Sequence, residues 1–162
     1  MVYHPEREQD VYWMSRALGY ARIAVQQGEV PIGCVIVLNG KEIGGSHDTK
    51  ELTKDPTGHA EINALRQASR YMGDWRLEDC ELYVTLEPCP MCMGSMIQGR
   101  IRRLIYGATN RRWTLGEQND LLLQNPTLNH QLEVTRHVLQ EECSTLLKQT
   151  FKQYRIQKSN KS

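Results

Sequence analysis

The chain has 162 residues and lacks several features that mark special classes of protein. No apolar run approaches the ~20 residues of a membrane-spanning helix, and the N-terminal residues do not resemble the apolar core of a secretory signal. There are no internal repeats and no low-complexity linker. Charges of both signs nearly balance, with a net charge of +1, so any nucleic-acid contact must come from local patches. We therefore expect a soluble, cytoplasmic protein with no membrane partner.

Cysteines are few, and their number is odd. Two of the five lie in Cys89-Pro90-Met91-Cys92, a spacing that suits a metal site. A disulfide framework is therefore not expected, and a reducing compartment is favoured. Cys34, Cys80 and Cys143 lie in apolar or helical runs, so we expect them to behave as small buried hydrophobic residues.

Two short segments carry the chemistry, and the first contains His59 and Glu61 while the second contains Cys89 and Cys92. Thiolate and imidazole ligands suit Zn²⁺, and three protein ligands leave a fourth position for water, as in catalytic zinc sites. Water in such a position becomes acidic enough to supply hydroxide near neutral pH. Glu61 follows His59 by two residues, close enough to handle the proton of that water. The pattern predicts one Zn²⁺ on His59, Cys89 and Cys92, with Glu61 as the catalytic residue.

Two other interpretations of these residues are weaker. A fragment of a structural Cys₂His site would need a fourth ligand, and no unused Cys or His has the spacing of a zinc finger. A redox-active dithiol would need no His-x-Glu. The two motifs occur together, about thirty residues apart and with Pro before the first Cys, which favours the catalytic site.

Hydrophobic periodicity and turn signals predict an alternation of helices and strands. Asn39-Gly40 is a strong hairpin signal, and Pro88 is expected to open the helix that carries the two cysteines. In chain order we expect a helix at 6–27, strands at 34–38 and 41–45, a polar loop at 47–57, a helix at 60–69, a strand at 82–86, a helix from Pro88, strands at 102–108 and 131–135, and a helix at 138–154.

This order predicts the α/β class, as a three-layer α/β/α sandwich with one mixed five-stranded sheet. The chain is expected to form a single domain over 1–157, followed by a flexible tail at 158–162.

The motifs resemble those of the cytidine deaminase superfamily and, within it, the bacterial tRNA-specific adenosine deaminases. The likeness covers nearly the whole chain and is carried by Glu29–Gly33, Asp55–Glu61, Leu82–Cys92, Leu128–His130 with Glu133-Val134, and Glu142-Cys143. The resemblance implies a cytidine deaminase-like fold with one zinc per subunit on His59, Cys89 and Cys92 and a proton shuttle at Glu61. It also implies hydrolysis of adenosine to inosine at the wobble position of tRNA, by a homodimer that binds the anticodon loop across both subunits.

Two places depart from the pattern of that family. Asp48 stands eleven residues before His59, where the family usually carries an Asn that reads the base or ribose. An ionised Asp can only accept hydrogen bonds, so it contacts a sugar hydroxyl, faces a ring atom that carries hydrogen, or lies in solvent.

The second departure is the loop 109–116, which is bulkier and more basic than usual. Its residues Arg111, Arg112 and Trp113 offer positive charge and a flat ring to a single-stranded nucleic acid. The alternative for this loop is a solvated turn with Trp113 packed on the protein.

Several side chains are candidates for contact with substrate, and three functions remain open. The candidates are Asp48, Pro31, Asn110, Arg111, Arg112, Trp113 and Phe151. The first function is the tRNA adenosine deaminase, and the second is a deaminase of a free purine, a pterin or another small nucleobase or nucleoside. The third is a non-catalytic RNA-binding module with structural zinc, and Glu61 argues against it because such a site needs no proton shuttle.

Overall fold

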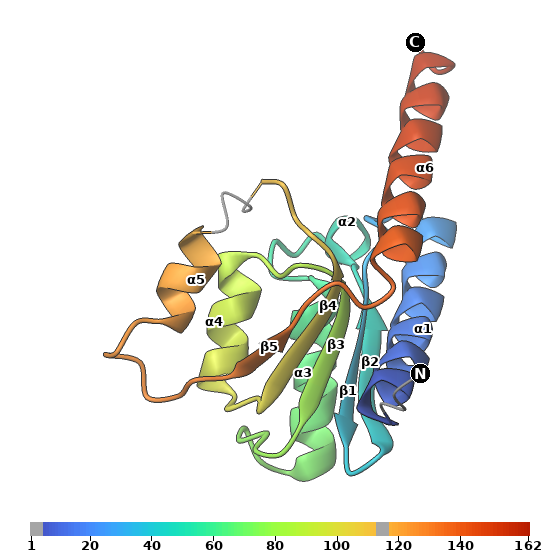
Figure 1. Ribbon diagram of the computed structural model, residues 1–162. Helices are drawn as coiled ribbons and strands as arrows, with labels where there is room; N and C mark the ends of the chain where they lie inside the picture. Colours follow the sequence, from blue (N-terminus) through green and yellow to red (C-terminus); the bar gives the residue numbers. More distant parts are fainter. Residues whose placement is uncertain (1–4, 113–116) are drawn as a thin grey trace.

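The computed structural model describes residues 5–112 and 117–162 (Figure 1). In chain order the elements are α1 Pro5–Gln26, β1 Gly33–Leu38, β2 Lys41–His47, α2 Lys50–Thr53, α3 Ala60–Met72, β3 Glu81–Leu86, α4 Pro90–Gln98, β4 Arg103–Ala108, α5 Glu117–Leu123, β5 Glu133–Thr135 and α6 Gln140–Ser159.

The strands form one mixed sheet in the order β2-β1-β3-β4-β5. The pairs β1–β2 and β1–β3 are antiparallel, while β3–β4 and β4–β5 are parallel. The turn between β1 and β2 is Asn39-Gly40, and its two residues have φ of 48° and 76°, as a tight hairpin with the twist of the sheet requires. The predicted five-stranded mixed sheet is confirmed.

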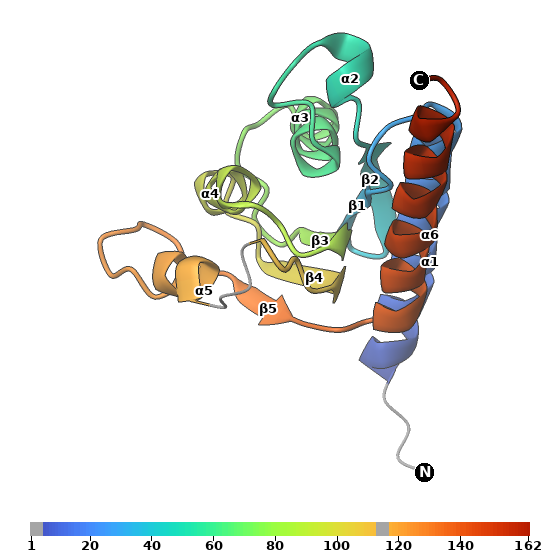
Figure 2. The same ribbon diagram turned by 90° about the horizontal axis from the view of Figure 1, so that it is seen from above.

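Helices cover both faces of the sheet (Figure 2). α1 and α6 lie side by side on one face, where Met14 and Leu18 of α1 and Cys143 of α6 pack on Val35 and neighbouring strand residues. α3 and α4 cover the other face, over a second cluster of buried apolar side chains, and α5 packs beside α4. The predicted three-layer sandwich is confirmed, and α1, the hairpin and α3 form where the sequence predicts them.

A buried ion pair between Asp10 and Arg103 links α1 to the sheet. The carboxylate of Asp10, which is 4% exposed, accepts hydrogen bonds from the Tyr83 hydroxyl at 2.8 Å and from both terminal nitrogens of Arg103 at 2.7 and 3.0 Å. These contacts satisfy a buried charge and fix α1 against β3 and β4.

Four predictions differ from the structure. α2 lies in the segment predicted as a loop, and α5 was not predicted. α4 begins at Pro90 rather than Pro88, because Cys89 stays extended (φ −71°, ψ 167°) as the residue before the first turn. α6 continues to Ser159, which extends the predicted helix into the segment expected to be a tail.

All five cysteines lie in the described part of the chain, and none forms a disulfide. Cys34, Cys80 and Cys143 are buried, as predicted. No helix within residues 5–112 and 117–162 is both long enough and apolar enough to cross a membrane.

Candidate active site

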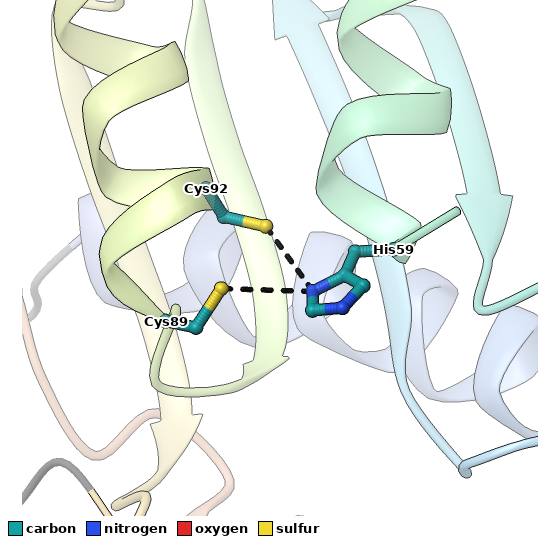
Figure 3. A group of neighbouring side chains, drawn as sticks. All are labelled: His59, Cys89 and Cys92. Atoms are coloured by element: carbon teal, nitrogen blue, oxygen red, sulfur yellow. Dashed lines mark hydrogen bonds between the residues drawn. The ribbon is translucent and has the colours of Figure 1, made fainter. Parts of the chain in front are cut away.

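Three side chains from two helix N-termini meet at one point (Figure 3). His59 immediately precedes α3, Cys89 immediately precedes α4, and Cys92 lies in the first turn of α4. Their ligand atoms all lie within 4.8 Å of one another. The Sγ atoms of Cys89 and Cys92 are 3.6 and 3.5 Å from Nδ1 of His59. The three predicted metal ligands are therefore brought together.

The spacing of these atoms suits a tetrahedral metal ion. With metal–sulfur bonds of about 2.3 Å and metal–nitrogen bonds of about 2.0–2.1 Å, tetrahedral angles place sulfur about 3.6 Å from nitrogen. The two observed sulfur–nitrogen distances of 3.6 and 3.5 Å agree with this value. Two sulfurs and one imidazole nitrogen also leave one tetrahedral position for a further ligand. The three side chains form a potential metal site, and the spacing of their ligand atoms fits a tetrahedral ion.

The two thiols differ in acidity. A hydrogen bond from Cys92, followed by contact with His59, lowers the pKa of Cys89 to about 4. The same hydrogen bond to Cys89, together with burial, raises the pKa of Cys92. The hydrogen bond with Cys89 also raises the pKa of His59. A bound cation displaces the proton of such a thiol, so metal binding and proton release are coupled here.

Glu61 lies beside the cluster in the first turn of α3 and is only 4% exposed. Burial raises the pKa of its carboxyl group to about 7. A buried carboxyl group next to potential metal ligands, rather than among them, is a typical proton-transfer group.

His59 and Cys89 of the cluster, together with Glu61, form part of the wall of a cavity of about 560 Å³. This volume is in the range of pockets for small molecules. The lining residues are Val30, Ile32, Asp48, Lys50, Pro56, His59, Glu61, Leu86, Glu87, Cys89, Met91, Asn110, Arg112, Leu147 and Phe151.

The family model of MafB19-like deaminases matches residues 8–155 of the chain. The chain belongs to this deaminase family.

Relatives with known names agree. A tRNA-specific adenosine deaminase from Streptococcus pyogenes is 39% identical over 153 residues, which cover 94% of this chain and 96% of the relative. One from Bacillus subtilis is 40% identical over 150 residues, which cover 93% of each. A solved structure from work on tRNA deaminases that edit A to I at the wobble position has a TM-score of 0.79 and 39% identity, and covers 84% of this chain and 99% of that one. The resemblance to tRNA-specific adenosine deaminases is confirmed.

The candidate substrate contacts of this deaminase fall into three groups. Asp48, Asn110, Arg112 and Phe151 line the cavity, and Asp48 is 2% exposed and so does not lie in solvent. Pro31 is buried between the lining residues Val30 and Ile32, and Arg111 is exposed outside the cavity. Trp113 lies outside the described residues.

Glu87 has a role in the deaminase that its place in the Glu-Pro-Cys motif did not reveal. It is 7% exposed, and its carboxylate accepts hydrogen bonds from the backbone N–H of Asn110 at 3.2 Å and from Nδ2 of Asn119 at 3.3 Å. Nδ2 of Asn119 also donates to the carbonyl of Pro88 at 2.9 Å. Glu87 thus ties the loop that carries Arg112 to the segment that carries Cys89. A buried acid beside a metal ligand was the available signal, but its partners are distant in sequence.

Proposed function

We propose that this chain catalyses the hydrolytic deamination of adenosine to inosine at the wobble position of a tRNA. The observation that carries the proposal is a buried carboxyl group, Glu61, beside a three-ligand cluster in a cavity wall, in a chain 39–40% identical to tRNA-specific adenosine deaminases over almost its whole length. The reaction consumes one water and releases one ammonia for each inosine formed.

Zn²⁺ is the ion that the donor set favours, at one per chain. His59, Cys89 and Cys92 would hold it, since two sulfurs and one nitrogen match its ligand preference and the fourth position stays open. When bound, it lowers the pKa of water to near neutrality and so makes water a nucleophile.

Glu61 carries the protons of the reaction. Its carboxylate takes a proton from the attacking water as the new C–O bond forms at C6 of adenine. It delivers this proton to the ring nitrogen N1. It then takes the second proton of the former water from the oxygen now bonded to C6 and gives it to the amino group, so that the C6–N bond breaks, the C6=O bond forms and ammonia leaves. Because Glu61 is buried but lines the cavity, its carboxyl group is placed to exchange protons with a substrate bound there.

The rim of the cavity suits a single-stranded nucleic acid. Arg112 and Phe151 also line an adjoining cavity of about 410 Å³, together with Tyr154, Arg155 and Lys158. Cations that pair with phosphates and aromatic rings on which bases stack are the usual surfaces for an unpaired strand. Asn110, Arg111 and Arg112 on the loop and Phe151 on α6 would therefore hold the anticodon loop while adenosine enters the cavity.

A homodimer in the cytoplasm is part of this proposal. A groove of about 1070 Å³ on the α3–α4 face is lined by apolar side chains that include Leu65, Trp75, Leu77 and Met91. Met91 also lines the cavity that holds Glu61, so a second copy seated in the groove would lie beside the active site. The tRNA substrate and the free thiols favour the cytoplasm.

The test compares an RNA anticodon stem-loop with adenosine at the wobble position, the same hairpin with guanosine there, and free adenine, guanine and cytosine. Inosine and ammonia are expected from the first substrate alone. Turnover of a free base without activity on RNA would contradict the proposal and indicate a deaminase of small nucleobases.

Glu61→Gln is expected to lower kcat by at least ~10³-fold, because the amide cannot take up and return the proton. Its metal content is expected to match that of the unaltered protein. The control is Glu78→Gln, which neutralises an exposed carboxylate outside the cavity and is expected to leave kcat unchanged. Substantial activity in Glu61→Gln would contradict the proton-transfer role.

A further inference from the structure

Two acidic side chains hold three successive backbone N–H groups at the start of α2. Lys50 N donates to Oδ1 of Asp48 at 3.0 Å, Glu51 N to Oε2 of Glu29 at 3.1 Å, and Leu52 N to Oε1 of Glu29 at 2.6 Å. Both acids are buried, with Glu29 1% exposed and Asp48 2% exposed. Because the three donors are consecutive, the two buried carboxyl groups lie side by side, and hydrogen bonding with Glu29 is one of the causes that raise the pKa of Asp48.

Two ionised carboxylates cannot form such a contact, because each can only accept a hydrogen bond. Buried carboxyl groups in contact therefore retain a proton between them, as paired acids in enzymes do. Each oxygen of Glu29 already accepts a backbone N–H, whereas Asp48 uses only Oδ1 in this way. Among these four oxygens, Oδ2 of Asp48 is the one that accepts no backbone N–H, so a proton shared by the pair would sit on this atom and be donated to Glu29.

We propose that Glu29 and Asp48 share one proton, so that Asp48 lines the active site as a neutral group fixed by two hydrogen bonds. In this state Asp48 accepts from Lys50 N and donates to Glu29. An asparagine side chain would make the same two contacts, through its amide oxygen and its amide N–H. Asp48 therefore acts as a positioning residue: its neutral carboxyl group holds the cavity wall through the same two hydrogen bonds that an asparagine amide would make.

The surroundings of Asp48 agree with this assignment. Burial is the largest influence and raises the pKa of Asp48, and the contact with Glu29 raises it further. The groups that oppose them are the N–H and charge of Lys50 on α2 and the charge of His59 before α3. Across the same cavity lies Glu61, which is also buried. Within the described residues, no hydrogen bond joins Asp48 to His59 or to either cysteine of the cluster.

A neutral Asp48 suits the substrate named above, and this consequence depends on the proposed function. A nucleic-acid strand brings phosphate charges to the rim of the cavity. An ionised Asp48 would add a second negative charge to that of Glu29 in a poorly solvated wall, and like charges at such sites repel strongly. The shared proton removes that repulsion while keeping the wall in place.

The first test measures stability and needs no substrate. A carboxyl group whose pKa is raised by folding stabilises the fold fully below its unfolded pKa of about 3.9, and this contribution is lost as the pH rises through the folded pKa. Asp48→Asn makes the same contacts without a titrating proton. The urea midpoint of Asp48→Asn relative to the unaltered protein is therefore expected to rise as the pH is raised above the unfolded pKa of about 3.9. The control Asp79→Asn neutralises an exposed carboxylate and is expected to show no such trend.

The second test measures kcat/KM on the adenosine-containing stem-loop over the same pH range. The ratio of Asp48→Asn to the unaltered enzyme is expected to be near one at low pH and to rise with pH. Asp48→Ala, which loses both contacts, is expected to be about tenfold less active or worse at every pH.

A midpoint difference that does not change with pH, or a constant loss of activity in Asp48→Asn, would overturn the shared proton and assign Asp48 as an ionised acceptor. Failure of the unaltered enzyme on every RNA would contradict the proposed function instead. The stability test would still decide the protonation of the pair.

Discussion

His59 and Cys89 hold equivalent positions, since each is the last extended residue before a helix begins. Serine, threonine, aspartate or asparagine at such a position caps the helix and stabilises it by about 1 kcal/mol. Neither His59 nor Cys89 makes a side-chain cap. Both side chains turn instead toward each other, where the positive ends of two helices favour thiolate. These two positions therefore carry residues of the potential metal cluster in place of residues that would cap the helices.

Removal of a single cluster thiol tests the metal site. Cys92→Ser is expected to lower the zinc content of the purified protein from about one ion per chain to near zero, because a hydroxyl is a far weaker ligand than a thiolate. Inosine formation is expected to be lost with it. Metal content is measured by plasma mass spectrometry on dialysed protein.

Cys80→Ala is the matched control, since Cys80 is buried but lies outside the cluster. It is expected to retain its zinc. Stoichiometric zinc in Cys92→Ser, or inosine formation that survives complete removal of metal by a chelator, would contradict a catalytic ion at this cluster.

At the scale of elements, α1 approaches β1 so closely that one position admits only glycine. A Cβ at Gly33 would lie 1.9 Å from the carbonyl oxygen of Ala17 and 2.5 Å from the backbone N of Ala21. Backbone atoms cannot move aside as a side chain can, so the helix would have to shift. Gly33→Ala is therefore expected to lower the free energy of unfolding by about 3 kcal/mol.

Gly19 supplies the matched control within α1. A Cβ there would meet no atom within 4 Å. Gly19→Ala is expected to raise the free energy of unfolding by about 0.5–1 kcal/mol, because alanine loses less backbone entropy in a helix. Urea denaturation followed by circular dichroism checks both variants. Equal effects of the two substitutions would show that close packing of α1 on β1 is not the cause.

Elements governed by neighbours in sequence were predictable, and elements governed by distant contacts were not. Met14, Leu18 and Ala21, which are spaced to share one face of the helix predicted at 6–27, are buried in α1, while Val25 on the same face is half-buried; Asn39-Gly40 makes the predicted hairpin turn. α2 is only four residues long, and its second and third N–H groups, those of Glu51 and Leu52, are held by Glu29, more than twenty residues earlier in the chain. No local pattern reports such a partner.

The active site divides in the same way. The structure brings together His59, Cys89 and Cys92, the three ligands that the spacing predicts, and Glu61 lies in the helical turn that follows His59. Their roles as ligands and proton shuttle remain predictions. The partners of Glu87 come from two later segments, 23 and 32 residues away. The contact of Asp48 with Glu29 also joins segments on opposite sides of the β1–β2 hairpin. Such pairings follow from the sheet order, which sequence patterns constrain only weakly.

At the scale of the whole molecule, the two faces of the sheet differ: one is covered by packed helices, and the other carries the cluster and an exposed apolar groove. On one face α1 and α6 pack on the sheet (Figure 2), and Asp10 of α1 forms an ion pair with Arg103 of β4. On the other face the N-terminal ends of α3 and α4 supply the cluster, and two large apolar side chains that line the groove are exposed: Trp75, in the segment after α3, is 53% exposed, and Met91 of α4 is 36% exposed. A groove with such a rim is typical of a protein interface. We therefore expect the chain to pair through the α3–α4 face.

Trp75→Glu tests this pairing. The unaltered protein is expected to sediment at twice the mass of the 18.7 kDa chain, and Trp75→Glu mainly at the mass of one chain, because a carboxylate buried in an apolar interface is strongly disfavoured. KM for the RNA stem-loop is expected to rise in the same variant, since Met91 belongs both to the groove and to the wall of the active site.

Tyr12→Glu is the control, because Tyr12 is similarly exposed, at 58%, on α1 across the sheet. A dimer lost in Tyr12→Glu but kept in Trp75→Glu would move the interface to the α1 face, and a monomeric unaltered protein would contradict the dimer itself.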